Sequence, residues 1–215
     1  MPIPTDITVP SPASTTSPTS PAAPEPTTQA QMPHPPSARG CLPTRERVSA
    51  VAGVSVQERC KLYDVSGTTA YALRASLDAH GPGAYDASTG WHVRWRYDLT
   101  VPNSGDCSVS GSSVSLIVTV TFPRWSHPRG AVALRHLWLS YMEDLKLHEA
   151  GHAAIAIRAA NRIARELRNA SAPTCEKTRR SANGQAHRIV LDARKRSSAY
   201  DVTTDHGATQ GAIFP

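Results

Sequence analysis

The sequence predicts an α+β fold in which a small antiparallel sheet packs against long helices. Two observations lead to this prediction. Apolar residues alternate with polar ones in much of the first half of the chain, and they recur at helical spacing in the second half. Strands that come first and helices that follow are typical of an α+β domain, and the longest helix is expected near its centre.

Residues 1–40 differ in composition from the rest of the chain. They contain 11 of the 18 prolines and many Ser, Thr and Ala residues, lack aromatic residues, and carry Asp, Glu or Arg only at Asp6, Glu25 and Arg39. Such a segment cannot bury enough apolar surface to offset its ordering entropy, so we expect a disordered, partly extended linker. The remaining residues, 41–215, are enough for one domain with its own core.

The folded part is expected to begin with a strand region and a short helix. Residues 45–65 alternate apolar and polar side chains in places, which predicts one or two strands. Thr68 is suited to cap a helix that runs to about Ala79, and the glycines and proline of residues 80–83 end it.

Residues 89–99 carry the clearest strand pattern, because their side chains point alternately to opposite faces. One face carries Trp91, Val93, Trp95 and Tyr97, and the other carries His92, Arg94, Arg96 and Asp98. A second strand is expected over residues 107–122, and antiparallel pairing of these two neighbours is the natural arrangement.

The periodicity becomes helical at about residue 129 and continues to residue 170, which predicts one long helix or two consecutive helices. Pro173 ends this region, and a further helix is expected over residues 174–198. The closing residues, 199–215, have no periodicity but contain many side chains able to bind a metal, so we expect a loop there.

The long helix contains His148-Glu149-Ala-Gly-His152, an HExxH pattern. Four residues are about one helical turn, so both imidazoles lie on one face and can bind one metal ion beside Glu149. The histidines interrupt two apolar rows with a spacing of seven: Leu134, Tyr141, His148, Ile155, and Trp138, Leu145, His152, Ala159. Buried imidazoles need partners, and Zn²⁺ would satisfy both. The alternative is a satisfied pair of core histidines or a decayed site.

Catalytic zinc normally takes three protein ligands and keeps one position for water, so a third ligand is required. His206 is the first candidate, because it adjoins a flexible glycine in the polar terminal segment. Asp201 is the second, either as a ligand or as a partner that orients a ligand histidine. Asp205 and Glu176 are further candidates, and a solvated tail is the alternative reading of this segment.

With zinc on His148, His152 and His206, the expected activity is hydrolysis of a peptide or protein substrate. Zinc would lower the pKa of its bound water, and Glu149 would accept the proton. Tyr200 could donate a hydrogen bond to the developing oxyanion. An exposed edge of the strand over residues 107–122 could hold an extended substrate.

Composition limits the remaining classes of function. The net charge is +6, but the arginines are scattered over expected helical surfaces and no nucleic-acid module accompanies them, so nucleic acid is not an expected partner. A basic surface-binding protein is the third hypothesis. No apolar run approaches the length of a transmembrane helix, and the residues after Met1 lack the basic start and apolar core of a signal peptide.

The four cysteines are widely spaced and form no CxxC pair, which favours disulfides over a zinc finger. Their spacing alone leaves three pairings open for Cys41, Cys60, Cys107 and Cys175.

Several segments together are similar to one protein family. They are Tyr63-Asp-Val-Ser-Gly67, Leu73-Arg-Ala-Ser-Leu77, Gly81-Pro82, Thr89-Gly-Trp-His-Val-Arg-Trp95, Phe122-Pro-Arg-Trp125, His148-Glu-Ala-Gly-His152, Cys175, Ala182-Asn183, Tyr200-Asp-Val-Thr-Thr-Asp-His206-Gly207, Gln210-Gly211 and Phe214-Pro215. With these segments the chain from about Lys61 to Pro215 resembles bacterial exported proteins of unknown function that are predicted to be secreted zinc-dependent proteases.

The resemblance implies a periplasmic or secreted protein with metal ligands at His148 and His152 and a base at Glu149. It also implies that the terminal segment belongs to the site and that Cys107 pairs with Cys175. The resulting hypothesis is a zinc metallohydrolase, a metalloprotease of the bacterial cell envelope. The alternative is a non-catalytic envelope binding module with a structural or degenerate zinc site.

Overall fold

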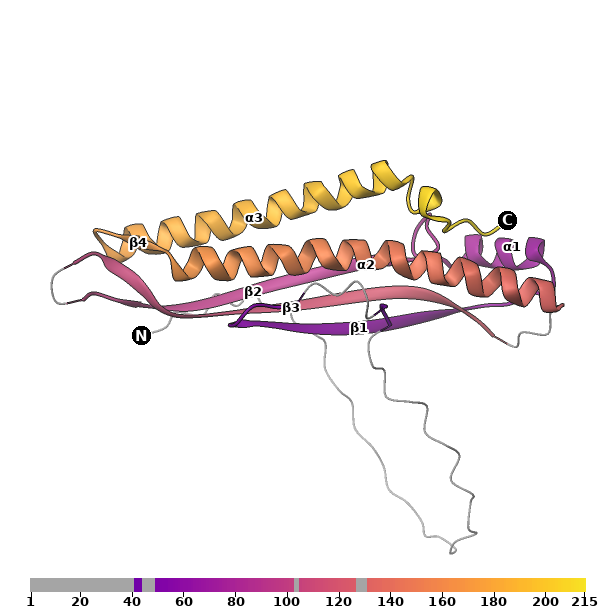
Figure 1. Cartoon of the computed structure of the whole chain (residues 1–215), viewed down its shortest axis with the longest axis horizontal. Helices are drawn as coiled ribbons and strands as arrows, with labels where there is room; N and C mark the ends of the chain where they lie inside the picture. The colour runs from indigo at the N-terminus through magenta and orange to yellow at the C-terminus, as the bar shows by residue number, and fades with distance from the viewer. Residues whose placement is uncertain (1–40, 44–48, 103–104, 127–130) are drawn as a thin grey trace, which may run out of the picture. The chain divides into compact units, whose positions relative to one another are not determined.

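A computed structural model describes residues 41–43, 49–102, 105–126 and 131–215 (Figure 1). The linker expected over residues 1–40 lies outside the described residues. Within them, a four-stranded sheet and long helices form an α+β fold, which confirms the predicted fold class. The elements in chain order are β1 (Val54–Val65), α1 (Ala70–His80), β2 (Ser88–Thr100), β3 (Cys107–Trp125), α2 (Val132–Arg168), β4 (Ser171–Ala172), α3 (Cys175–Thr204) and the 3-10 helix η2 (Ala208–Gln210).

The sheet has the order β1-β3-β2, and β4 pairs with the start of β3. β2 and β3 are antiparallel, as the sequence predicted, but β1 and β3 are parallel. The order in which the chain connects the three strands explains this direction. β2 starts at the end of the sheet where β1 stops, so it runs back, and β3 reverses the direction once more and becomes parallel to β1. The expectation of a purely antiparallel sheet was therefore wrong for β1.

The position of β3 changes where a substrate could pair with the sheet. β3 lies between β1 and β2 and is hydrogen-bonded on both sides. The prediction that this strand offers an exposed edge was wrong. Among the described strands, β2 pairs with β3 alone and so has an edge that is not hydrogen-bonded to another strand.

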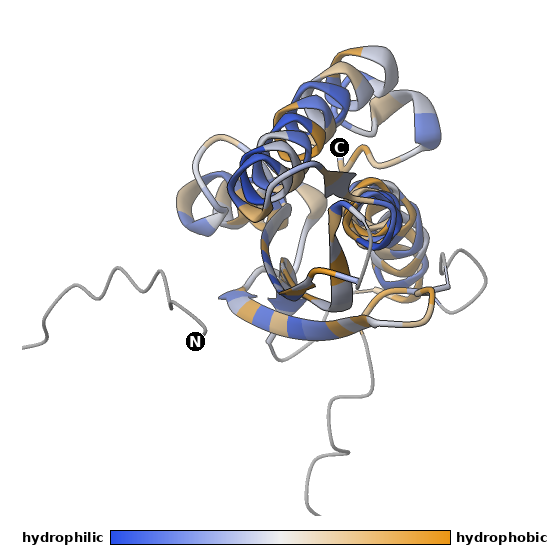
Figure 2. Ribbon diagram, turned by 90° about the vertical axis from the view of Figure 1, so that its left-hand side faces the viewer, coloured by the Kyte–Doolittle hydropathy of each residue, from blue (hydrophilic) through white to orange (hydrophobic). Residues whose placement is uncertain are grey.

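The core lies between one face of the sheet and the long helix α2. Alternate side chains of β3 are buried there, whereas the intervening ones face outward, and strands with alternating hydrophobic and hydrophilic bands are visible in Figure 2. The buried set of β3 is Val114, Leu116, Val118, Val120 and Phe122. At one end of the core, the rings of Trp125, Tyr141 and Phe214 surround Trp138, with centroid distances to Trp138 of 5.6–5.8 Å.

The helices differ from the sequence prediction mainly at their ends. α2 is one uninterrupted helix rather than two. Thr69 caps α1 in place of Thr68, because its hydroxyl accepts a hydrogen bond from the amide of Ala72 at 3.1 Å. α3 continues to Thr204, six residues beyond the predicted end at Ser198, so the segment at Tyr200 is helical and the expectation of a loop there was wrong.

Small buried residues line the packed face of α3: Ala182, Ala186 and Ala193 flank Ile189. Short side chains let two helices approach closely, and α3 packs along α2 as Figure 1 shows. This packing carries the carboxyl-terminal end of α3 to the middle of α2.

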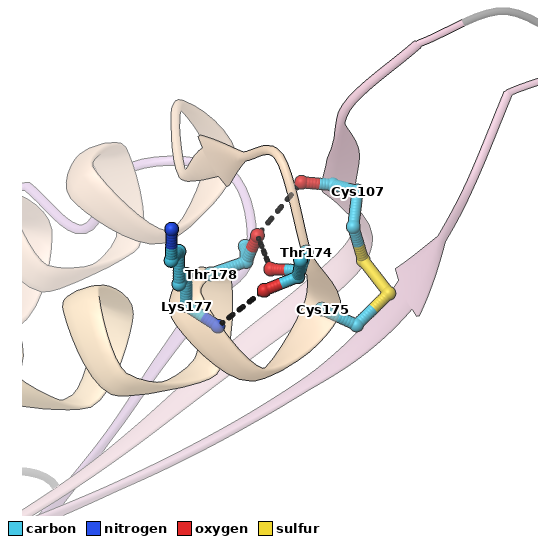
Figure 3. Close-up of a disulfide and its surroundings, with 5 residues drawn as sticks. All are labelled: Cys107, Thr174, Cys175, Lys177 and Thr178. Carbon is cyan, nitrogen blue, oxygen red and sulfur yellow. Dashed lines mark hydrogen bonds between the residues drawn. A yellow bond between two sulfur atoms is a disulfide. The ribbon is translucent and has the colours of Figure 1, made fainter.

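Two disulfides join distant parts of the chain: Cys41 with Cys60, and Cys107 with Cys175, the pair that the resemblance implies. The second bond ties the start of β3 to the start of α3, where the Thr178 hydroxyl also donates a hydrogen bond to the Cys107 carbonyl at 2.8 Å (Figure 3). Disulfides of this kind form in oxidising compartments and support an extracytoplasmic setting. Within the described ranges, no helix has the length and hydrophobicity needed to cross a membrane.

Candidate metal centre

The HExxH segment lies on α2 and its side chains face the interior. His148, Glu149 and His152 have exposed fractions of 4%, 3% and 7%, although each side chain is polar. Their location on the apolar face of the helix is the one that the spacing of the sequence predicted. Buried polar groups require partners, and the surrounding elements supply them.

The first partner is Asp201, which the continued helix α3 brings against both histidines. Its Oδ1 atom lies 2.8 Å from Nε2 of His152 and 3.4 Å from Nε2 of His148, and the two Nε2 atoms are 3.2 Å apart. With each ring hydrogen on Nδ1, all three atoms offer lone pairs that can bind a cation. The Asp201 side chain keeps an exposed fraction of 29%, so solvent can reach this point.

The other ring nitrogens of the histidines are held by two residues that the sequence did not single out as site residues. Nδ1 of His148 lies 3.0 Å from Oε1 of Gln210, and Nδ1 of His152 lies 2.7 Å from the hydroxyl of Ser197. An amide oxygen can only accept, so His148 donates from Nδ1 and its Nε2 lone pair faces Asp201. Gln210 belonged to the segments that carry the family resemblance, whereas Ser197 gave no signal.

Burial also affects the charge of His152. It lowers the pKa of this imidazole, and the carboxylate of Asp201 only partly opposes the effect. The ring is therefore mainly neutral at neutral pH, which is the state that binds metals.

Two glycines allow close packing around the imidazoles. A Cβ atom on Gly151, inside the HExxH segment, would overlap the hydroxyl oxygen of Tyr200. Gly207 has φ of +90°, and a Cβ atom there would lie 2.9 Å from Cγ of His148. Neither position has room for a side chain, so α3 and the terminal turn can rest directly on the face of α2 that carries His148 and His152.

Tyr200 was predicted to donate a hydrogen bond to an oxyanion. Its ring stacks on His148 with a centroid distance of 5.1 Å and an interplanar angle of 10°, and it meets the ring of His152 edge-on. Its hydroxyl exchanges hydrogen bonds with the amide of Gln210 at 3.0–3.2 Å. The observed contacts therefore orient the two imidazoles, and the role at an oxyanion stays a prediction.

Glu149 has its own hydrogen-bond partner on the sheet. The Thr89 hydroxyl of β2 donates to its Oε2 atom at 2.6 Å. Burial raises the pKa of Glu149 from its ordinary 4.5 to about 7; the bond from Thr89 opposes the rise, and the charge of Asp201 adds to it. A carboxylate with a pKa near neutrality is suited to accept and return a proton.

His206, the first candidate for the third ligand, lies at the edge of this group. Its Nδ1 atom is 4.0 Å from Oδ1 of Asp201, its side chain is 48% exposed, and its ring stacks on Tyr85 at 4.8 Å. Around the HExxH segment, the residues whose ligand atoms all lie within 4.8 Å of one another are His148, His152 and Asp201. Asp201, the second candidate for third ligand, therefore occupies the position beside the two histidines that was expected for His206.

The remaining candidates lie elsewhere. Asp205 is exposed and forms the left-handed cap of α3. Glu176 lies in the first turn of α3 and pairs with Arg180. It is about 37 Å along the helix axis from Asp201, so it cannot reach the same ion.

The donor set fits a zinc ion. Two imidazole nitrogens and one carboxylate oxygen are typical ligands of catalytic zinc. Ligands arranged tetrahedrally at about 2.0–2.1 Å from zinc lie roughly 3.3 Å from one another. The observed separations of 2.8, 3.2 and 3.4 Å are close to that value.

Comparison with known families places most of this chain, residues 60–207, in a family described as bacterial protein of unknown function (DUF922). The chain belongs to the DUF922 family. The match includes the HExxH segment and Asp201, whereas Gln210 lies beyond it. The resemblance to bacterial proteins of unknown function is thereby confirmed, and the DUF922 description names no activity. No curated protein and no solved structure matches the chain.

Proposed function

We propose that this DUF922 protein is a zinc metallohydrolase that cleaves peptide bonds in the periplasm or outside the cell. The observation that carries the proposal is the convergence of His148, His152 and Asp201 within 2.8–3.4 Å beside a buried carboxyl group, that of Glu149. The two disulfides support the location.

In this proposal His148, His152 and Asp201 bind the zinc ion, with Asp201 in place of His206 as third ligand. A bound zinc ion supplies Lewis acidity, which lowers the pKa of a coordinated water and polarises a substrate carbonyl. Gln210 and Ser197 hold the imidazoles by their Nδ1 atoms, so that both Nε2 atoms stay directed at one point.

Glu149 acts as general base in this mechanism. Its carboxylate takes a proton from the attacking water and returns it to the leaving amine, which restores the starting state of the carboxylate. The Thr89 hydroxyl holds the Oε2 atom and leaves the second oxygen for the water. The raised pKa of Glu149 suits both transfers, because a group with a pKa of about 7 gains and loses a proton easily at neutral pH.

The test uses Glu149→Gln, which keeps the size of the side chain and removes the base. The variant should bind zinc as the wild type does and should lose at least about a hundredfold in hydrolysis of an unstructured protein such as casein. Glu143→Gln on the exposed side of the same helix is the matched control and should keep full activity. Unchanged hydrolysis by Glu149→Gln would refute the mechanism.

A second candidate function is a zinc site without turnover. It is favoured by the position of His206, 4.0 Å from Asp201, because a small movement of its exposed ring could supply a fourth ligand. Structural zinc sites are closed by four protein ligands, whereas catalytic sites keep a position for water. Zinc-loaded wild-type protein without hydrolytic activity, together with weaker zinc binding by His206→Ala, would support this candidate.

A further inference from the structure

The edge of β2 passes directly beside the proposed general base. Thr89, the second residue of β2, contacts the side chain of Glu149 through its hydroxyl. Within the described part of the chain, this strand is paired only with β3, and its other edge offers unpaired backbone groups. An extended peptide can add to such an edge by main-chain hydrogen bonds.

The helix α3 runs along the same part of β2 toward the metal centre. Far from the centre, the indole of Trp95 donates to the side chain of Asn183 at 3.0 Å. At the centre, Ser197 of α3 contacts His152. From Trp95 to Thr89 the strand covers about 20 Å, and from Asn183 to Ser197 the helix covers about 21 Å. The two elements therefore lead to the site side by side.

The outward face of β2 carries unpaired positive charge. Arg94 and Arg96 are exposed, and neither forms an ion pair with any carboxylate in the described ranges. Arg94 donates from Nε to Nε2 of the exposed His92 at 3.2 Å. The exposed Asp98 lies on the same face, two residues beyond Arg96 and farther from Thr89. Across the sheet, Arg59 of β1 is in register with Gly90 through Thr119 of β3, so it lies on the same face. The opposite face of β2 is apolar and partly buried.

We infer that the edge of β2 binds the substrate of the metal centre as an added strand, and that this substrate is an extended segment in which acidic residues alternate with apolar ones. The inference rests on the proposed function and names its substrate class. In an added strand, one set of side chains lies beside His92, Arg94 and Arg96. The other set lies beside Trp91, Val93 and Trp95.

The charge of the β2 face should determine which peptides bind to its edge. Opposite charges on neighbouring strands attract, and like charges repel. The two arginines along the strand should therefore favour glutamate over lysine at alternate positions by about tenfold in affinity at low salt, and the preference should shrink as salt is added. Basic side chains on an edge strand can also serve only to prevent self-association, and in that case no peptide adds to the edge.

The experiment measures binding of fluorescent eight-residue peptides to the full-length protein by anisotropy. One peptide alternates Val and Glu, a second alternates Val and Lys, and a third is the Val-Glu peptide with methylated backbone nitrogens at alternate residues. Glu149→Gln protein and chelator-treated wild-type protein are both used, so that no cleavage occurs. The Val-Glu peptide should bind best, and methylation should abolish its binding by blocking main-chain pairing.

The charge is tested by Arg94→Glu combined with Arg96→Glu, which should reverse the preference in favour of the Val-Lys peptide. Arg158→Glu combined with Arg165→Glu, at two exposed arginines of α2, is the matched control and should leave the preference unchanged. Equal binding of all three peptides, or no binding to either protein, would overturn the inference. Because binding is measured without turnover, loss of the proposed hydrolase activity would not mimic this result.

Discussion

Two clusters of buried and half-buried polar groups lie against α2, and they differ in the balance of their charges. Around Asp86, the guanidinium of Arg74 binds both carboxylate oxygens, and the hydroxyl of Tyr141 donates to Oδ2 at 2.7 Å. Tyr63 donates to the main-chain oxygen of Asp86 at 2.7 Å. Every acceptor in this cluster faces a donor, and the negative charge faces a positive one.

Around Asp201 the balance is different. The carboxylate faces two imidazole Nε2 atoms, and the Nδ1 hydrogen of His148 is already used by Gln210. Among the described residues, Asp201 forms ion-pair contacts only with histidines and has no arginine or lysine partner. The difference teaches that the Asp86 carboxylate has its cationic partner within the chain, whereas the Asp201 carboxylate lies where the proposed zinc ion would supply one.

The largest expected effect comes from the Asp86 cluster. Asp86→Ala leaves Arg74 and the buried hydroxyl of Tyr141 without their acceptor and should lower the free energy of unfolding by about 3 kcal/mol. Urea unfolding should give this loss equally with zinc and with a chelator. A loss seen only with zinc would show that the two clusters are not independent.

The buried carboxyl group of Glu149, beside the proposed zinc site, should make the stability of the zinc-free protein depend on pH. The folded-state pKa of Glu149 is raised from 4.5 to about 7, so the folded state binds more protons than the unfolded state between these values. Stability should therefore fall by about 3 kcal/mol as pH rises through this window. Glu149→Gln removes this contribution, so the difference between its urea midpoints and those of the wild type should grow from pH 4.5 to 7. A difference that stays constant over this pH range would contradict the raised pKa of Glu149.

Two substitutions distinguish Asp201 from His206 as the third zinc ligand. Asp201→Ala should weaken zinc binding by at least about a hundredfold, since removal of a ligand costs more than the 10–100-fold loss typical of an outer partner. His206→Ala should change the affinity by less than about threefold. Competition with a chromophoric chelator gives both values. The opposite order of effects would restore His206 as the third ligand.

The smallest effect is expected from the partners of the imidazoles. Gln210→Leu and Ser197→Ala should each weaken zinc binding by about tenfold, because the rings lose the acceptors that direct their Nε2 atoms. Thr209→Ala, next to Gln210 and without contact to a histidine, serves as control and should bind zinc normally. Unchanged affinity in both variants would mean that α2 alone fixes the rings.

The sequence was informative where local spacing determines structure. The seven-residue rows around His148 and His152 placed both rings on the buried face of one helix, because helical periodicity fixes which residues share a face. The alternation at Trp91 and Val93 likewise gave β2 and its two faces.

The sequence was less informative where contacts between residues far apart in the chain determine the structure. Residues such as Val202 and Thr203 disfavour a helix, yet α3 continues to Thr204, and Asp201 in its last turn contacts His152 on α2. Because the helix continues, Asp201 rather than His206 lies against the two imidazoles. Gln210 and Ser197 are ordinary polar residues in the sequence, and only the packing of α3 and η2 onto α2 gives them their partners.

X-ray absorption spectroscopy at the zinc edge, on full-length protein stripped of metal and reloaded with one equivalent of zinc, measures the metal environment most directly. We expect stoichiometric uptake and a first shell of two imidazole nitrogens and oxygen ligands at about 2.0–2.1 Å. Protein that takes up no zinc, or zinc that shows no imidazole in its first shell, would contradict the metal centre of His148, His152 and Asp201.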